Sequence, residues 1–189
     1  MMAETNGLIP TPGQTVGPFY GYALPYEGGP ELIRTADPRA VRLYGTVRDA
    51  EGTPVPDALL EIWQADDHGQ VPQETGSLHR DGYTFTGFGR ADVNRAGEYQ
   101  FITLNPGATE EGKAPFILLT IFARGLLDRL YTRVYLPEYR DLVETDSGLG
   151  DLSVEDRRRL FAHRDKDGSL HFDVHLAGSS QSVFFTYSQ

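Results

Sequence analysis

The 189-residue sequence contains no cysteine, and this absence removes two structural devices at once. A chain without cysteine forms no disulfide and offers no thiolate to a metal ion. The absence fits a reducing compartment. The segment from Met1 to Pro10 also lacks the basic and apolar regions of a signal peptide, so we expect a cytoplasmic protein.

Long apolar segments and basic residues are scarce as well. The longest apolar run, Phe116 to Ala123, is interrupted by Thr120 and is far shorter than the roughly 20 residues that cross a bilayer. Lys and Arg number 17 against 27 Asp and Glu, which gives a net charge of −10. A field of that sign repels phosphate backbones. We therefore expect neither membrane insertion nor nucleic-acid binding.

Aromatic and turn-forming residues, in contrast, are abundant, with ten Tyr, ten Phe, 21 Gly and 12 Pro. Between the turns, hydrophobic residues alternate with polar ones, which is typical of half-buried strands. The run at 116–123 is continuous and indicates a strand covered on both faces. The pattern predicts a mainly β fold, namely an antiparallel β-sandwich, and the length is sufficient for one well-buried domain. The predicted strands cover 41–48, 59–63, 83–88, 98–104, 116–123, 130–136, 170–176 and 181–187.

Helices and the N-terminal region complete the predicted fold. Ser153 is a good N-cap for a short helix, with acidic residues in its first turn and Leu160 and Phe161 on its apolar side. Residues 1–40 have little periodicity and are rich in Pro and Gly, yet they contain Phe19 and Tyr20. We expect a long N-terminal arm over 1–40, a sandwich domain over 41–189, and one or two short helices.

The stretch from Leu59 to Val71 is the one around which we expect the chain to be organised, because a strand there leads into a polar loop. Alternation puts Leu60 and Ile62 on one face and Trp63, the only tryptophan, on the other. Asp66, Asp67 and Gly69 then form a turn. A core strand that carries a polar loop to the surface is a common way to build a site, although these residues alone favour a plain core strand with its turn.

A self-contained active site is not visible in the residue types. His171 and His175 share a strand face, but at about 3.3 Å per residue their Cα atoms lie roughly 13 Å apart, too far to share one ion. The sequence has no Gly-x-Ser-x-Gly nucleophile motif and no phosphate-binding loop. The remaining histidines have no metal-binding spacing. They are His68, His79 and His163.

Two arginines are candidates for binding an anion. Arg124 ends the apolar run, and Arg133 lies between Tyr131 and Tyr135 on one face of a predicted strand. A guanidinium beside aromatic rings binds a carboxylate well. Each residue fits an exposed surface or a subunit interface equally well, so both readings stay open.

Several motifs together resemble the intradiol ring-cleavage dioxygenases, over residues 11–187. The combination of Gly-Pro-Phe-Tyr and Trp-Gln-Ala-Asp in this order is specific, whereas the Gly-x-Val-x-Asp piece alone is weak. The motifs are Thr15-x-Gly17-Pro18-Phe19-Tyr20, Gly45-x-Val47-x-Asp49-x-x-Gly52-x-Pro54-Val55, Ile62-Trp63-Gln64-Ala65-Asp66-x-x-Gly69, Gly97-x-Tyr99-x-Phe101, Pro106-Gly107 and Phe122-Ala123-Arg124-Gly125.

The resemblance implies a ligand set that this sequence has lost. Iron-bearing members hold Fe(III) with two Tyr and two His, and the matching positions here are Val71, Thr109, Phe116 and Leu118. One hydroxyl and three hydrocarbon side chains cannot hold iron. We therefore expect no metal in this chain, and we expect the apolar run at 116–123 to have become core.

Such a chain resembles the iron-free alpha-type subunits of the family, which pair with a homologous beta subunit that carries non-haem Fe(III). The resemblance implies O₂-dependent ring opening of a catechol acid in aromatic catabolism, through the beta-ketoadipate pathway, by a hetero-oligomer. The arm over 1–40 would pack on the partner. The chain would contribute no catalytic residue but part of the substrate-pocket wall, namely Thr15, Gly17, Pro18, Phe19, Arg124 and Arg133.

Two rivals remain on sequence grounds. A non-catalytic β-sandwich module that binds a ligand or protein is compatible with the missing catalytic set, although such a module would not need the N-terminal arm. A homomeric intradiol enzyme with displaced ligands would need Tyr and His pairs elsewhere, and the sequence shows no place for them.

Overall fold

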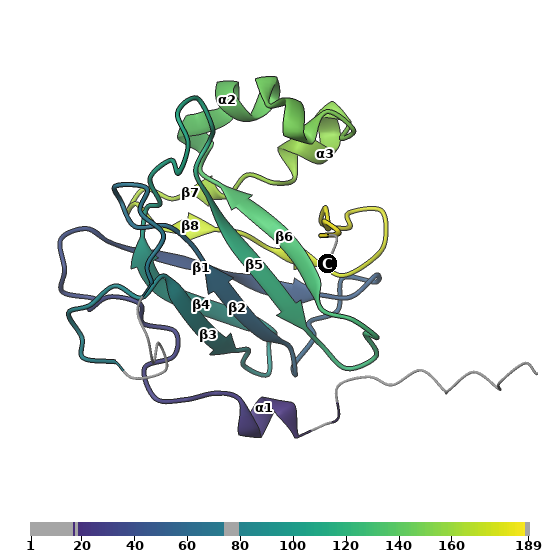
Figure 1. Cartoon of the computed structure of the whole chain (residues 1–189). Coiled ribbons are helices and arrows are strands. Elements are labelled where there is room, and N and C mark those ends of the chain that lie inside the picture. The colour runs from purple at the N-terminus through teal and green to yellow at the C-terminus, as the bar shows by residue number, and fades with distance from the viewer. Residues whose placement is uncertain (1–16, 18, 74–79, 188–189) are drawn as a thin grey trace, which may run out of the picture.

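Two β-sheets lie face to face in the computed structural model, which describes residues 17, 19–73 and 80–187 (Figure 1). The first sheet has the order β4-β1-β8-β7, with β9 also paired to β1, and the second has the order β3-β2-β5-β6. The predicted mainly β sandwich is confirmed. The strands are β1 (Ala40–Arg48), β2 (Leu59–Trp63), β3 (Phe88–Asp92), β4 (Glu98–Leu104), β5 (Phe116–Phe122), β6 (Leu130–Tyr135), β7 (His163–Arg164), β8 (Leu170–His171) and β9 (Val174–His175).

The second sheet is antiparallel throughout, and β5 is central in it. Trp63 of β2 pairs with Leu118 of β5, and Leu118 pairs on its other side with Arg133 of β6. The first sheet is mixed, because β1 is antiparallel to β4 but parallel to β8 and β9. The register on β5 positions the pocket described below, since it aligns Trp63, Leu118 and Arg133 across three neighbouring strands.

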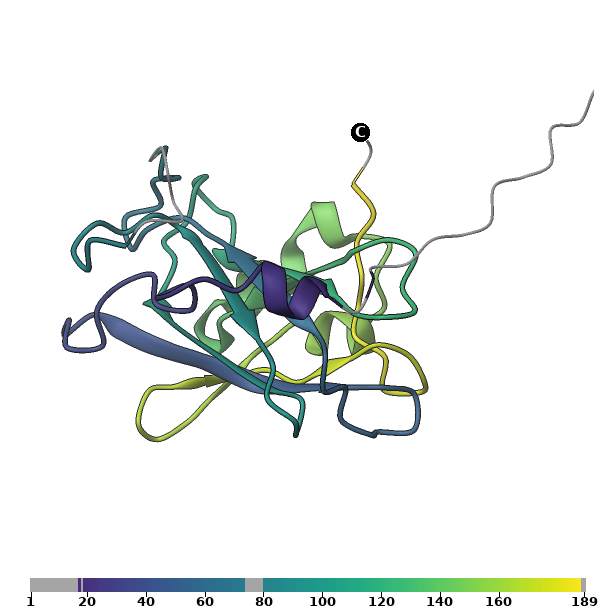
Figure 2. The same cartoon turned by 90° about the horizontal axis from the view of Figure 1, so that it is seen from below.

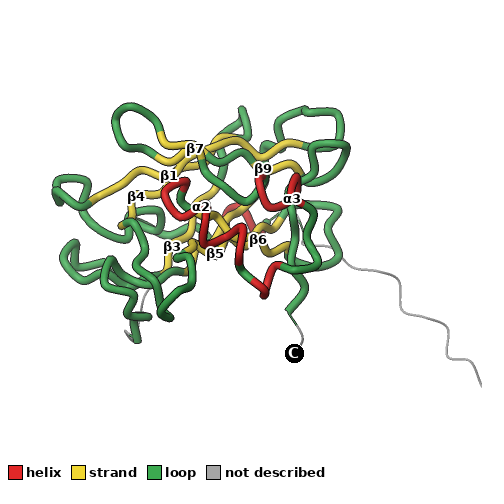
Figure 3. Tube along the Cα trace, turned by 90° about the horizontal axis from the view of Figure 1, so that it is seen from above, coloured by secondary structure: helices red, strands yellow, loops and turns green. Residues whose placement is uncertain are grey.

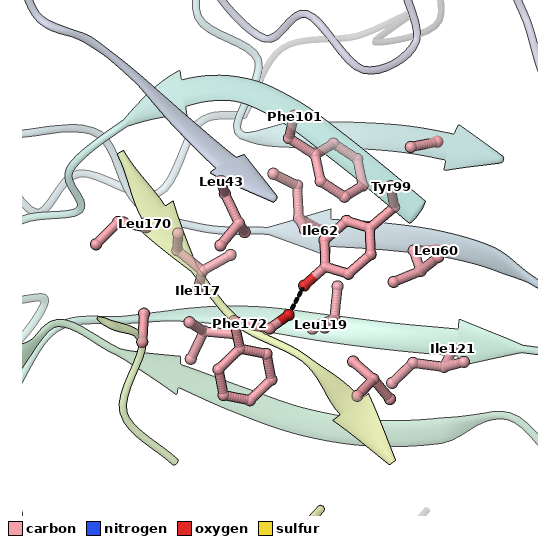
Figure 4. Close-up of a cluster of buried hydrophobic side chains, with 14 of the residues drawn as sticks. Leu43, Leu60, Ile62, Tyr99, Phe101, Ile117, Leu119, Ile121, Leu170 and Phe172 are labelled. Carbon is pink, nitrogen blue, oxygen red and sulfur yellow. Dashed lines mark hydrogen bonds between the residues drawn. The ribbon is translucent and has the colours of Figure 1, made fainter. Parts of the chain in front are cut away.

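The core fills the space between the sheets, where the inward faces of both meet (Figure 4). Ile62, Ile117 and Leu119 from the second sheet are at most 1% exposed. From the first sheet, the Tyr99 hydroxyl donates a hydrogen bond of 2.6 Å to the backbone oxygen of Phe172, deep in this core. Buried polar atoms need such partners, so this bond ties β4 to the segment between β8 and β9.

Helices lie at two opposite ends of the sandwich. The helix α1 (Tyr20–Ala23) lies at the lower end in Figure 1, and Figure 2 shows it in front of the sheets from below. At the upper end α2 (Arg140–Thr145) and α3 (Val154–Arg158) lie close together, as Figure 3 shows from above. Short 3₁₀ turns flank them, η1 (Pro137–Tyr139) and η2 (Ser147–Leu149).

The predicted helix after Ser153 is confirmed, but it is shorter than its apolar pattern indicated. The Ser153 hydroxyl accepts a hydrogen bond of 3.0 Å from the Asp156 backbone N–H, as an N-cap does. The helix ends at Arg158, so Leu160 and Phe161 lie beyond it. Leu160 is fully buried, and its oxygen accepts from the Tyr135 N–H, which diverts the chain toward β6.

Three strand predictions need correction. Residues 83–87 are irregular, and the strand predicted there begins at Phe88 as β3. The strand at 170–176 is divided into β8 and β9, because the Asp173 side chain accepts a 2.8 Å hydrogen bond from the Thr46 backbone N–H in place of a ladder bond. Residues 181–187 form no regular strand, and their β-type pairing is limited to an isolated bridge between Phe185 and Tyr131.

Part of the predicted arm packs on this chain's own sandwich. Leu32 is 1% exposed and belongs to the main core. Its backbone N–H donates to the oxygen of Ile102, and the Ile102 N–H donates to the oxygen of Pro30. The contact with a partner that we predicted for the arm would therefore have to come from the residues before Tyr26. Among the described residues, the structure contains no helix that is long and apolar enough to span a membrane.

Candidate functional site

Two loops from different sheets meet at one end of the second sheet. The Asp66 carboxylate accepts backbone hydrogen bonds of 2.9 and 2.8 Å from His68 and Gln70, which closes the loop after β2. The Gly107 N–H then donates to the Asp66 backbone oxygen at 2.7 Å. Gly69 has φ of +81°, and a Cβ there would lie 2.0 Å from the Ala108 oxygen. The two loops therefore fit together only because a glycine stands at the contact.

These loops and the start of β5 line a pocket of about 230 Å³ that is open to solvent on one side. We call it the Trp63 pocket. It is lined by Trp63, Gln64, Ala65, Val71, Gly107, Thr109, Ala114, Pro115, Phe116, Leu118, Arg133 and Tyr187.

All four predicted ligand positions line the Trp63 pocket together. The expectation that this region has become core is therefore wrong for its outer face. Ile117, Leu119 and Ile121 point into the core and are fully buried, whereas Phe116 and Leu118 on the opposite face are partly exposed to the pocket. Alternation along β5 explains the difference, because successive side chains point to opposite faces.

The lining does not suit a metal ion. At the four ligand positions only Thr109 carries an oxygen, on an exposed side chain. The Gln64 amide is buried and already bonded, since it accepts from Thr103 at 2.7 Å and donates to the Leu104 oxygen at 3.0 Å. Arg133 adds a positive charge that repels a cation. Ferric iron does not fit this donor set.

The described side-chain contacts of Arg133 are all with aromatic residues. Its guanidinium carbon lies 4.6 Å from the Phe116 ring centroid and 4.9 Å from that of Phe185. Its Nε donates to the Tyr187 hydroxyl at 3.1 Å, and Nη1 donates to the Tyr135 hydroxyl at 3.3 Å. Burial lowers the pKa of Arg133, but these hydrogen bonds outweigh it and the pKa lies above its ordinary value. The group stays cationic.

A second pocket of about 330 Å³ lies at the α1 end of the sandwich. We call it the Arg124 pocket. Its lining residues are Tyr20, Gly21, Tyr22, Pro56, Asp57, Ala58, Asp92, Val93 and Arg124.

Arg124 in this pocket forms an ion pair with Asp57 through its Nε. The side chain is 60% exposed, which leaves the outer edge of the guanidinium open to solvent. Tyr20 is buried beside the pair. Burial, strengthened by the charge of Asp57 and opposed by that of Arg124, raises the pKa of Tyr20 to about 12. Sequence reasoning missed Asp57, which belongs to no motif, and it placed Tyr20 in the Gly-Pro-Phe-Tyr motif without assigning that residue to a pocket wall.

The structure brings some predicted wall residues together and separates others. Phe19, just before α1, is 75% exposed near the Arg124 pocket, and Gly17 is also exposed. Arg124 follows β5, whereas Arg133 pairs with Leu118 near its start. The strand runs from Leu118 only to Phe122 before the chain reaches Arg124, so the two arginines lie near opposite ends of β5. Thr15 and Pro18 lie outside the described residues.

The histidines have local contacts of their own. His171 stacks on Tyr44 with ring centroids 4.9 Å apart, and its Nε2 lies 3.1 Å from Asp173. His68 and His163 are exposed, and His79 lies outside the described residues. In the part of the chain that the structure describes, no group of three or more His, Cys, Asp or Glu is arranged to hold a metal ion.

Comparison with known proteins gives these pockets their context. The family model described as Dioxygenase matches residues 16–123. The protocatechuate 3,4-dioxygenase alpha chain of Burkholderia cepacia is 34% identical over 94% of this chain and 98% of its own length. The chain belongs to the intradiol ring-cleavage dioxygenase family. The resemblance inferred from the motifs is thereby confirmed, and the likeness to an alpha chain covers nearly the whole sequence.

Two further matches agree with this family. The protocatechuate 3,4-dioxygenase beta chain of Burkholderia cepacia is 32% identical over 56% of this chain and 48% of its own length. The dioxygenase domain of a carbohydrate-binding fusion protein from Streptomyces sp. SirexAA-E superposes with a TM-score of 0.58 at 23% identity, covering 90% of this chain and all of that domain. The structural match supports the fold of this intradiol dioxygenase family member.

Proposed function

We propose that this chain is the iron-free alpha subunit of a protocatechuate 3,4-dioxygenase. With a homologous beta subunit that carries non-haem Fe(III), it would take part in the O₂-dependent intradiol cleavage of protocatechuate to 3-carboxy-cis,cis-muconate. The reaction would serve aromatic catabolism in the beta-ketoadipate pathway. Taken alone, the chain should be inactive.

One observation carries this proposal. The four positions that match the family's iron ligands lie together around the Trp63 pocket, yet they hold Val71, Thr109, Phe116 and Leu118. The scaffold of an intradiol site is thus present without a donor set for iron. A family member of this kind would need the metal from another chain, and the likeness to both an alpha and a beta chain supports a homologous beta chain as the partner.

The exposed aromatic residues near α1 support a partner at that end. Phe19 and Tyr22 are 75% and 86% exposed, and Leu24 is 39% exposed. Neighbouring exposed apolar side chains of this size are uncommon on a free surface and typical of an interface. We infer that the segment before Tyr26 lies against the beta subunit, as the predicted arm would.

The chain's own residues would then act on the substrate as a wall. Arg124 can offer its outer guanidinium edge to the substrate carboxylate while Asp57 holds its Nε. Gly17 and Phe19 would lie beside it, with Thr15 and Pro18 of the same motif. Arg133 remains a second candidate for the wall, but it would need to reach the shared site from the opposite end of β5. The metal on the partner would supply the redox chemistry.

The decisive experiment compares this chain alone with the same chain co-expressed with its beta partner. Iron content and protocatechuate-dependent O₂ uptake are measured in both preparations. We expect the lone chain to be iron-free and inactive and the pair to contain iron and consume O₂. Stoichiometric iron and turnover in the lone chain would overturn the proposal, and so would failure of the two chains to associate.

A further inference from the structure

The Trp63 pocket holds a positive charge for which the described residues supply no carboxylate. No Asp or Glu in the described part of the chain lies within salt-bridge distance of Arg133. Asp146 feels its charge, but the Asp146 carboxylate is paired with Lys113 at 2.6 Å. The two oxygens bonded to Arg133 belong to neutral phenols. A half-buried cation that lacks a counter-ion is a site for an anion.

The geometry leaves donors available for that anion. A guanidinium has five N–H groups, and two are used by Tyr187 and Tyr135. The Phe116 and Phe185 ring centroids lie 4.6 and 4.9 Å from the guanidinium carbon, and the other three N–H groups have no described hydrogen-bond partner. Arg133 is part of the lining of the Trp63 pocket. A carboxylate there can accept two parallel hydrogen bonds from Arg133.

The rest of the lining suits an aromatic ring. Trp63, Val71 and Leu118 offer apolar surface across from Arg133, and Trp63 is 43% exposed. A dry apolar cavity of about 150 Å³ is large enough to bind benzene. At about 230 Å³ the Trp63 pocket has room for one ring with a carboxylate attached. Two fused rings or a long chain would extend out of it.

We propose that the Trp63 pocket binds a single-ring aromatic carboxylate without a metal ion, its carboxylate on Arg133 and its ring against Trp63 and Leu118. This is a second site within the chain, separate from the Arg124 pocket at the other end of β5. It involves no covalent step. The inference goes beyond the proposed function and needs neither the beta subunit nor iron.

The Arg133 charge, rather than the net charge of the chain, sets the specificity of this site. A net charge of −10 repels anions, but at physiological salt that repulsion is screened beyond about 8 Å, whereas a contact with Arg133 is not. A neutral ring of the same size would leave the Arg133 charge uncompensated. The carboxylate should therefore contribute most of the selectivity, and a matched neutral ligand should bind more weakly.

The only tryptophan lines the pocket, so its fluorescence reports binding directly. We would titrate the full chain, purified alone in the presence of a chelator, with 4-hydroxybenzoate and separately with 4-hydroxybenzyl alcohol. The acid cannot chelate a metal as a catechol does. We expect a saturable change in Trp63 emission with the acid, and at least tenfold weaker binding of the alcohol.

Three variants separate the proposal from a general surface effect. Arg133→Met should weaken binding of the acid at least tenfold and leave the alcohol nearly unchanged. Arg140→Met removes another arginine stacked on an aromatic ring, Phe161, outside the pocket, and it should leave the Kd of the acid unchanged. Leu118→Phe fills part of the pocket without adding a second tryptophan, and it should weaken binding of the acid at least tenfold while the far-ultraviolet circular dichroism stays the same. This variant keeps the proposal testable if Arg133→Met fails to fold.

Three outcomes would overturn the inference. The first is the absence of a saturable signal with the acid up to millimolar concentration in a folded chain. The second is equal binding of the acid and the alcohol, and the third is equal weakening of acid binding by Arg133→Met and Arg140→Met. Because no partner and no turnover enter the measurement, its failure is distinguishable from failure of the alpha–beta proposal.

Discussion

A few single residues determine the local structure, because a buried polar atom or a glycine at these positions permits only one arrangement of the neighbouring segments. Tyr99 is 3% exposed, and its hydroxyl reaches a backbone oxygen in the middle of the core. Burial, helped by the charge of Asp173, shifts the pKa of Tyr99 far upward, so the hydroxyl remains a donor at every ordinary pH. The sequence pattern predicted a strand over 98–104, but it could not reveal that the Tyr99 hydroxyl would reach into the core or which oxygen would accept the bond.

The Tyr99 hydrogen bond gives a first prediction. Tyr99→Phe leaves the Phe172 oxygen buried without this donor, which should lower the free energy of unfolding by about 1–3 kcal/mol. Urea denaturation followed by circular dichroism measures the change. Tyr22→Phe is the matched control, because Tyr22 is 86% exposed, and it should change stability by less than about 0.5 kcal/mol. Equal effects of the two changes would refute the assignment.

The Tyr20 phenol gives a second prediction, on pH. Its pKa of about 12 in the folded chain exceeds the ordinary value of 10, so the folded state holds the proton more tightly than the unfolded state. The stability that Tyr20 contributes is complete below pH 10 and is lost as the pH rises toward 12. Asp57→Asn removes a charge that raises this pKa and should lower it, as measured by ¹³C-tyrosine NMR. Asp37→Asn should leave the Tyr20 resonance unchanged; an equal shift would contradict the coupling.

At the scale of elements, the alternation of side chains predicted most of the strands, and tertiary contacts decided the exceptions. The strand predicted over 98–104 is β4, with the same bounds. The break between β8 and β9 comes from a side chain, Asp173, that bonds to the backbone of β1, and no periodicity signals that. The Trp63 pocket was hidden for a similar reason. The run at 116–123 reads as uniformly apolar, although its two faces have different surroundings.

The contact between the two pocket loops gives a third prediction. Gly69 and Gly52 both have φ of +81°, but a Cβ at Gly52 meets nothing within 4 Å, whereas at Gly69 it would lie 2.0 Å from the Ala108 oxygen. Gly52→Ala should cost about 1–2 kcal/mol of stability from backbone strain alone. Gly69→Ala should cost at least about 1 kcal/mol more, measured by thermal and urea unfolding, because the loops must separate. Equal costs would show that the loops do not rely on this contact.

Over the whole molecule, the two ends of the sandwich differ in structure. One end carries α1, and the other carries α2 and α3 (Figure 1). The Arg124 pocket is lined partly by residues of α1, and the Trp63 pocket lies where β5 begins. The sequence predicted both sets of residues through family motifs. It could not predict that the two arginines lie near opposite ends of β5, since the position of Arg133 beside Leu118 becomes clear only when the register is known.

The exposed α1 end gives a fourth prediction, on assembly. Replacing Phe19 and Tyr22 together by Ser should weaken association with the beta partner at least tenfold, because two large aromatic contacts are lost. Analytical ultracentrifugation or surface plasmon resonance measures this. The unfolding free energy of the isolated chain should change by less than about 0.5 kcal/mol for each exposed residue.

Val154→Ser is the control for this assembly prediction. Val154 is 65% exposed and starts α3 at the opposite end, so its replacement should leave the affinity unchanged. Similar weakening by Val154→Ser, or none by the double change, would place the interface elsewhere.

The parallel pairing of β1 has a consequence for synthesis on the ribosome. β1 is a central strand, and its contacts with the C-terminal strands join residues such as Thr46 and Asp173 that are 127 positions apart. At about 5–20 residues per second, translation leaves one edge of β1 without its partner strands β8 and β9 for roughly 6–25 s. An open edge of that kind invites pairing with other nascent chains. Slow translation should therefore reduce the soluble yield of this chain more than that of a protein whose strands pair locally.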